Sequence, residues 1–269
     1  MTHHSQTCRS RMGHRPITQG KRVLRALLIA AIMPSLMGLT RPAMAQAPVR
    51  FQVLDAADFA PDVVLPPPPV AGSIEEKADL MAVHRLVESA SPARKAQAKE
   101  DAAHEDPSVF DGAAGIRLED LPATWALLRL VQNEGEVAAD LSKTRFSRLR
   151  PFAVDPTLPN CDGTAVPGRS YPSGHSTIGY SVGLMLAELM PQKASAILGR
   201  ARDYALSRVI CGVHYPADLD ASHTLGTMVT VRLLLDPAVA GPIAAARAEL
   251  ARAQTVPPAL ARPKSAAAQ

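Results

Sequence analysis

Apolar residues recur at every third or fourth position in several separate stretches of this 269-residue chain, and no stretch alternates between apolar and polar residues. The clearest example holds Ile178, Val182, Met185 and Leu189. Aromatic residues make up only 4% of the chain, whereas small and aliphatic residues are plentiful. This pattern predicts an all-α fold, because amphipathic helices without strands can only bury their apolar faces against one another.

Helical spacing covers most of the chain after Ser73. Ser73 and Glu76 form a capping box, which marks the start of a helix. We expect the further helices within residues 91–112, 118–141, 178–189, 192–211 and 217–235.

Proline-rich segments divide the chain into parts. Residues 46–72 end in four consecutive prolines and predict an extended arm on the surface. Residues 73–240 form the expected helical domain. Inside it, residues 151–172 form a long proline- and glycine-rich loop, and loops of this length are often functional. Residues 241–269 are rich in Ala and Pro and predict a tail whose end is disordered.

The first 45 residues have the layout of a secretory signal peptide. A basic stretch over residues 9–25 precedes an apolar run over residues 26–39, and Ala43-Met44-Ala45 is a small-x-small cleavage site. The alternative is a membrane anchor, but the run contains Pro34 and is shorter than the roughly 20 residues that span a bilayer. We therefore expect cleavage, export to the periplasm and no stable membrane anchor afterwards.

Removal of residues 1–45 reverses the sign of the net charge. Seven basic residues and no acidic residue leave, so the mature chain carries 22 basic and 25 acidic residues, a net charge of about −3. Nucleic-acid binding depends on clustered positive charge, so we expect no nucleic-acid partner. The sequence does not decide whether the chain forms a homo-oligomer.

Two cysteines, Cys161 and Cys211, remain after the signal, because Cys8 leaves with it. An even number of cysteines in an oxidising compartment allows a disulfide between them. Two free buried thiols are the alternative, and the sequence favours neither.

Cofactor-binding motifs are absent from the chain. It contains no P-loop, no GxGxxG, no Cys-x-x-Cys and no His-Glu-x-x-His. These absences remove sequence support for a nucleotide, a dinucleotide or a zinc site, and we expect no cofactor and no metal.

Three segments concentrate charged and polar residues. In the first, six residues separate Lys143 from Arg150-Pro151. Seven positions are two turns of a helix, so both cations can face one side and bind an anion with several oxygens. The alternative is a solvated helix face, which Arg145 and Arg148 nearby make serious.

The second segment, Pro172-Ser173-Gly174-His175, lies where a helix begins. Ser173 is a good N-cap, Gly174 allows an anion close to the backbone, and the free N–H groups of a first turn bind anions. His175 would then lie near the anion. The alternative is an ordinary capped helix with a surface histidine.

The third segment runs from Ser207-Arg208 through His214 to Asp218. Arg208 continues an apolar stripe, where a charge needs a partner. A carboxylate four residues after His214 can accept a proton from one ring nitrogen, which leaves the other free as a nucleophile or base. The alternative is a structural His–Asp pair.

Taken together, the segments reproduce K-x6-R-P, P-S-G-H and S-R-x5-H-x3-D in that order. The chain resembles the type 2 phosphatidic-acid-phosphatase (PAP2) superfamily, which includes the vanadium haloperoxidases. Residues 170–175 and 207–214, with the proline-rich run at 65–69, resemble the bacterial class A non-specific acid phosphatases. The resemblance covers roughly residues 60–235 and implies a helical bundle of the acid phosphatase and haloperoxidase type.

This resemblance implies a role for each motif residue. His214 would attack phosphorus, Asp218 would orient it, and His175 would protonate the leaving alcohol. The residues that would hold phosphate oxygens are Lys143, Arg150, Ser173, Gly174 and Arg208. The substrates would be small phosphate monoesters, hydrolysed with broad specificity without a metal. No family role attaches to His223 or to the residues near Asp162.

Other functions compete with this interpretation. A lipid or diphosphate phosphatase of the same superfamily is less well supported, because the mature chain has no uncharged apolar run of 18 residues. A haloperoxidase would need bound vanadate. A non-catalytic phosphate-binding protein would not need two histidines and a carboxylate.

Overall fold

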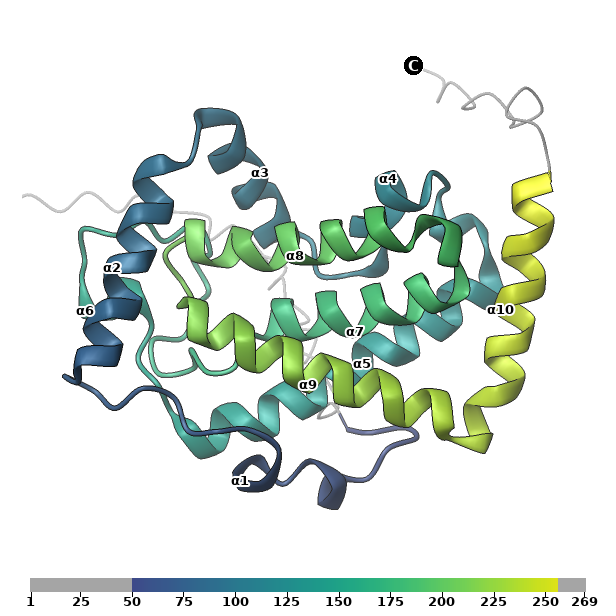
Figure 1. The fold of residues 1–269 in the computed structure, drawn as a ribbon, viewed down its shortest axis with the longest axis horizontal. Coiled ribbons are helices and arrows are strands. Elements are labelled where there is room, and N and C mark those ends of the chain that lie inside the picture. Colours follow the sequence, from purple (N-terminus) through teal and green to yellow (C-terminus); the bar gives the residue numbers. More distant parts are fainter. Residues whose placement is uncertain (1–49, 256–269) are drawn as a thin grey trace, which may run out of the picture. The chain divides into compact units, whose positions relative to one another are not determined.

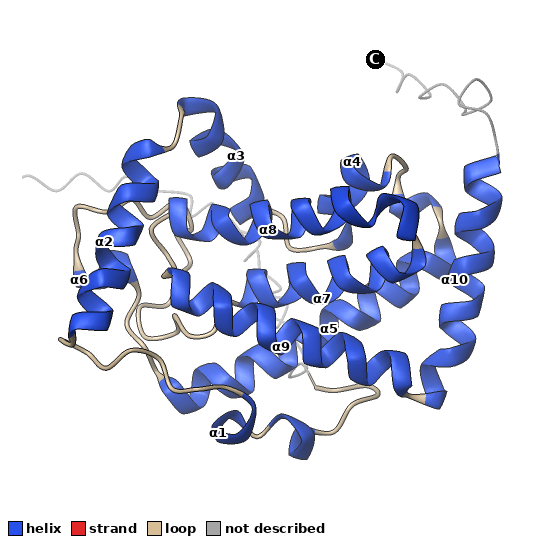
Figure 2. Ribbon diagram, in the orientation of Figure 1, coloured by secondary structure: helices blue, strands red, loops and turns tan. Residues whose placement is uncertain are grey.

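The computed structural model describes residues 50–255, and this part of the chain contains ten α-helices, four short 3-10 helices and no strand (Figures 1 and 2). The expected all-α class is confirmed. The signal peptide predicted at residues 1–45 and the final residues of the predicted tail, 256–269, lie outside the described residues.

Helix α7 (Gly174–Leu189) is the centre of the bundle. Twelve of its 16 residues are buried, because other helices cover it on several sides. Its main neighbours are α5 (Pro122–Phe146), α8 (Ala194–Ile210) and α9 (Pro216–Leu235). In Figure 1, α7, α8 and α9 run side by side across the view.

Small residues on α7 allow its neighbours to approach closely. A Cβ atom added at Gly183 would lie 3.0 Å from the Cβ of Ala201, and one at Gly179 would lie 2.7 Å from the Tyr204 ring, both on α8. Such contacts leave no room for larger side chains in a close-packed core. The aliphatic composition therefore suits tight helix packing.

Two further helices cover the end of the bundle where the motifs lie. Helix α2 (Ile74–Ser89) contacts α8 and α9, and α3 (Pro92–Ala103) contacts α8. Ser73 caps α2 by accepting a hydrogen bond from the Glu76 backbone, as the sequence predicts. The expectation of a helix within residues 91–112 is met by α3, which η2 (Pro107–Phe110) and α4 (Asp111–Ala114) follow.

The helix predicted over residues 118–141 differs at both ends. Residues Leu118–Asp120 form the short helix η3, and α5 begins at Pro122, since a proline suits the first helical position. Helix α5 continues to Phe146 and ends where Ser147 takes a left-handed conformation with φ 47°.

The expectation of a purely extended arm over residues 46–72 is wrong in part. Its described residues include η1 (Ala56–Phe59) and α1 (Pro61–Val64), and the prolines after Leu65 lie outside any helix. Phe59 and Leu65 are 1% and 3% exposed. These two side chains belong to the main core, so the arm is part of the domain rather than a cover on its surface.

The predicted boundary at residue 240 is also wrong. Helix α10 (Pro237–Thr255) follows α9 and packs against α5, α7 and α9, so the helical domain continues to at least residue 255. Its apolar side chains enter the core at helical spacing, namely Val239, Ile243, Ala246 and Leu250. This spacing is visible in the sequence, but the high content of Ala and Pro masked it.

Within residues 50–255 we find no single helix that is long and apolar enough to cross a membrane. Helices α9 and α10 meet the length and composition test only together, and they are bent by 92° at their junction.

Candidate active site

Six of the eight predicted site residues line one cavity of about 210 Å³. They are Lys143, Arg150, Gly174, His175, Arg208 and His214. The other two, Ser173 and Asp218, are fully buried beside the cavity and are absent from its lining. Segments more than 60 positions apart in the sequence therefore meet at one site.

The start of α7 forms one wall of this cavity. The Ser173 hydroxyl accepts hydrogen bonds from the backbone and side chain of Ser176, and the Ser173 backbone donates to Ser222 on α9. Ser173 is thus an N-cap, as predicted, and it also links the start of α7 to α9. A Cβ atom at Gly174 would lie 2.7 Å from Lys143 Nζ, so the ammonium lies against the helix N-terminus, where anions bind.

Lys143 and Arg150 line the same cavity for a reason other than the predicted one. Helix α5 ends at Phe146, so the two residues do not share a helix face. Arg150 instead precedes the short helix α6 (Pro151–Val154). Its guanidinium donates to the carbonyls of Val166 and Val213 at 2.8 and 2.9 Å, which directs it into the cavity.

His214 follows the turn between α8 and α9 and is 1% exposed. Arg150 Nη1 lies 2.7 Å from His214 Nε2, and Asp218 Oδ2 lies 3.2 Å from His214 Nδ1. A guanidinium can only donate, so Nε2 must be the acceptor, and the ring proton is then on Nδ1, facing Asp218. His214 therefore presents an unprotonated Nε2 to the cavity.

Asp218 is fully buried and accepts several hydrogen bonds besides that of His214. Arg148 Nη1 donates to it at 2.7 Å, the Ser170 hydroxyl at 2.6 Å and the Tyr215 backbone at 2.9 Å. Burial raises the pKa of Asp218 to about 6, although Arg148 and the other donors act in the opposite direction. The carboxylate is thus held rigidly behind His214.

Arg148 is a site residue that the sequence analysis missed. It was grouped with a solvated helix face, yet it is only 6% exposed. Its guanidinium bridges Asp218 and Asp79 of α2, and it stacks on the Tyr215 ring at 3.8 Å. The only signal in the sequence was a cluster of basic residues, which cannot reveal which arginine turns inward.

Arg208 is 1% exposed and has one ionic partner. Its Nη2 donates to Asp162 Oδ2 at 2.6 Å, whereas Nε and Nη1 are buried with no hydrogen-bond partner among residues 50–255. Unpaired buried donors are costly. Because these nitrogens belong to a residue that lines the cavity, they can donate hydrogen bonds to the oxygens of a bound anion. Asp162 was also missed, since nothing in its local sequence predicts this pair.

His175 lies on the first turn of α7 and lines the same cavity as His214. Its Nδ1 lies 2.9 Å from Glu105 Oε1, and its Nε2 lies 3.3 Å from the Ala102 carbonyl. Both neighbours are acceptors, so both ring nitrogens are satisfied only when each carries a hydrogen. Glu105 is a further lining residue without a motif to predict it.

The cations lower one another's affinity for protons. Burial lowers the pKa of Lys143, and Arg150 and Arg169 add to this effect while Asp140 opposes it. Burial and Arg208 lower the pKa of Arg150 to about 10. Burial also holds the pKa of His214 well below its usual range, and the nearby cations lower it further. Mutual repulsion of this kind is relieved when an anion binds.

A disulfide fixes the loop that forms the remaining wall. Cys161 and Cys211 are joined, with their Cα atoms 5.2 Å apart. Residues 162–169 of this loop supply five lining residues, namely Asp162, Thr164, Ala165, Val166 and Arg169. The bond holds this loop against the C-terminal end of α8.

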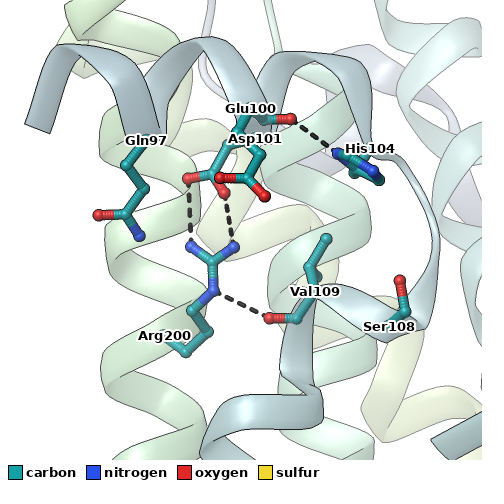
Figure 3. Close-up of a pocket in the computed structure, with 7 residues that line it drawn as sticks. All are labelled: Gln97, Glu100, Asp101, His104, Ser108, Val109 and Arg200. Carbon is teal, nitrogen blue, oxygen red and sulfur yellow. Dashed lines mark hydrogen bonds and ion pairs between the residues drawn. The ribbon is translucent and has the colours of Figure 1, made fainter. Parts of the chain in front are cut away.

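A second pocket lies between α3, η2 and α8 (Figure 3). Asp101 binds Arg200 through two hydrogen bonds of 2.6 and 3.1 Å and accepts another from the Ser207 hydroxyl. Arg200 also donates to the Val109 carbonyl. Ser207 of the third motif thus ties α8 to α3 instead of facing the cavity, and Asp101 and Arg200 satisfy each other in this pocket.

Comparison with known proteins shows the family of this chain. Residues 125–239 match the PAP2 superfamily. The chain is 32% identical over 195 residues to a non-specific acid phosphatase of Salmonella typhimurium, covering 69% of this chain and 78% of that protein. It is 34% identical over 205 residues to an acid phosphatase of Zymomonas mobilis, covering 72% and 77%. The chain belongs to the class A acid phosphatases of the PAP2 superfamily, and it is a phosphatase.

Two further matches were found. A non-specific acid phosphatase of Providencia stuartii is 32% identical over 199 residues, covering 70% of this chain and 80% of that protein. A crystal structure of a transmembrane PAP2-type phosphatidylglycerolphosphate phosphatase from Bacillus subtilis covers 65% of this chain and 89% of that chain, with 19% identity and a TM-score of 0.46.

Proposed function

We propose that this phosphatase hydrolyses small phosphate monoesters with broad specificity. The reaction passes through a phosphohistidine on His214 and needs no metal. The observation that carries the proposal is the state of His214: its Nδ1 proton faces Asp218, and its Nε2 lone pair faces a cavity lined by buried cations. A neutral imidazole can attack the phosphorus of a phosphate ester, and the positive charge beside it stabilises the negative charge on the phosphate oxygens.

In the first step, His214 Nε2 attacks phosphorus as the ester P–O bond breaks. The phosphate oxygens replace His214 as the partner of Arg150 and satisfy the free nitrogens of Arg208, while Lys143 adds a third cation. His175 donates its proton to the leaving alkoxide. In the second step, water attacks phosphorus, His175 takes a proton from that water, and the P–N bond breaks to release phosphate.

The assay that tests this proposal is release of p-nitrophenol from p-nitrophenyl phosphate at acidic pH. We expect turnover that persists in excess chelator and that vanadate inhibits, because vanadate resembles pentacoordinate phosphorus. Turnover lost on chelation and restored by a divalent cation would instead indicate a metallophosphatase. Bound phosphate without turnover would indicate a binding protein.

The lowered pKa of His214 predicts activity at acidic pH. Burial and the adjacent cations disfavour the imidazolium form, so Nε2 stays unprotonated below the ordinary histidine pKa of about 6.5. The acidic limb of kcat/KM should therefore fall below that value. A full pH–rate profile checks this, and an acidic limb at or above pH 6.5 would contradict it.

We further propose export to the periplasm. The support is the signal-like layout of residues 1–45 and the disulfide between Cys161 and Cys211, which suits an oxidising compartment. N-terminal sequencing of the protein from a cell fraction tests this, and we expect the mature chain to begin at Gln46 and to be found in the periplasmic fraction. An intact N-terminus in the cytosolic fraction would refute it.

A further inference from the structure

We propose that the outer half of the cavity selects substrates by the charge of their alcohol, and that Glu136 of α5 makes this selection. The preferred substrates are monoesters of amino alcohols, whose alcohol carries a cation, and those whose alcohol carries a second anion are disfavoured. This rests on the proposed function, because the alcohol is placed relative to a phosphate held by Lys143, Arg150 and Arg208.

Exposure divides the cavity into an inner and an outer half. The side chains of Arg208, His214 and Lys143 are 1%, 2% and 11% exposed, respectively. The side chains of Glu105 and Asp140 are 45% and 50% exposed. The phosphate site is therefore the floor, and the alcohol of a bound ester extends toward the exposed lining residues, which include Glu105, Asp140 and Arg169.

Most of the outer carboxylates already have a partner. Glu105 pairs with His175. Asp140 pairs with Arg169 at 2.8 Å and lies 3.6 Å from Lys143. Asp162, which is less exposed, pairs with Arg208. These four contacts hold residues of the site in place and leave little charge on these three carboxylates for a ligand.

Glu136 is the exception. It lines the cavity and is half-buried, yet it has no hydrogen-bonding or ion-pairing partner among residues 50–255. Burial raises its pKa, and the nearby carboxylates Glu105 and Asp140 raise it further, although Lys143 and Arg129 oppose this without pairing with it. Negative charge is thus in local excess at this position, and a ligand cation would supply the missing counter-ion.

The helix geometry places Glu136 at a suitable distance from the phosphate. Glu136 and Lys143 are seven residues apart on α5, which is two turns on one face and about 10 Å along the axis. An alcohol of two or three carbons bound to a phosphate at Lys143 can extend into this interval. If the alcohol instead carries a carboxylate, that group is repelled by Glu136 and by the nearby carboxylates of Glu105 and Asp140.

The test uses three esters with the same two-carbon skeleton: O-phosphoethanolamine, 2-hydroxyethyl phosphate and 2-phosphoglycolate, which end in a cation, a neutral group and an anion. We expect kcat/KM for phosphoethanolamine to exceed that for phosphoglycolate by at least about tenfold, at one fixed pH of about 6.5. Glu136→Gln should reduce this ratio at least fivefold, and kcat/KM for 2-hydroxyethyl phosphate in the same variant is the uncharged reference.

Glu119→Gln is the matched control, since Glu119 is 65% exposed in η3 and does not line the cavity. It should leave the ratio unchanged. If the wild type hydrolyses p-nitrophenyl phosphate and the neutral ester but Glu136→Gln leaves the charge ratio unchanged, the selection is refuted and the phosphatase proposal stands. If no ester is hydrolysed, the proposed function fails and the selection fails with it.

Discussion

Replacement of His214 with alanine is expected to abolish the phosphoenzyme and to lower kcat by about 10⁴-fold or more. The reason is geometric, because the Nε2 lone pair of His214 faces the cavity beside Arg150 and the Asp218 carboxylate lies behind the ring. The measurement is a rapid quench with radiolabelled substrate into alkaline detergent, since a phosphorus–nitrogen bond on histidine survives alkali and hydrolyses in acid.

A second histidine of α9 provides the control for this experiment. His223 is exposed, packs against the Tyr180 ring at 4.7 Å and does not line the cavity. His223→Ala should retain both turnover and the labelled intermediate. Trapping of a phosphoenzyme in His214→Ala, on any residue, would show that another side chain is the nucleophile.

Gly212→Ala is expected to lower the free energy of unfolding by about 4 kcal/mol, the largest stability effect that we predict for one methyl group. Gly212 has φ +69°, and an added Cβ would collide with the carbonyl oxygen of Pro159. Its own carbonyl accepts a hydrogen bond from the Phe152 backbone. The turn before His214 and the loop near the disulfide must therefore both shift, which urea denaturation under oxidising conditions measures.

Gly199→Ala is the matched control. Gly199 lies inside α8, and a Cβ atom there would have no neighbour within 4 Å. Since alanine is the better helix former, this variant should gain about 0.5–1 kcal/mol. An unfolding free energy for Gly212→Ala equal to that of the wild type would mean that the turn tolerates a side chain and that the collision is absent.

The features that were predictable from the sequence are local ones. The Ser173 N-cap and the spacing of apolar residues after it define α7 within a few positions, because both signals depend on residues three or four apart. The pair of His214 and Asp218 is likewise one turn apart at the start of α9. Local spacing therefore predicted the two histidines and the anion-binding helix start.

The features that were not predictable depend on contacts between distant segments. Arg148 and Arg150 are two residues apart, yet one binds Asp218 and Asp79 while the other faces His214. The direction of each side chain depends on where α5 ends, at Phe146, and on partners more than 60 positions away in the sequence. The same holds for Asp162, whose partner is Arg208.

The disulfide has a consequence for where this enzyme can work. The bond between Cys161 and Cys211 holds one wall of the substrate cavity, and such bonds persist only in oxidising surroundings. In the reducing cytosol the protein would keep its helices and its histidines. Without the disulfide, however, the loop that forms one wall of the cavity would no longer be fixed to α8. Under the export proposed above, the binding site would become fully ordered only after the chain has left the pool of phosphorylated compounds that the cell needs to keep.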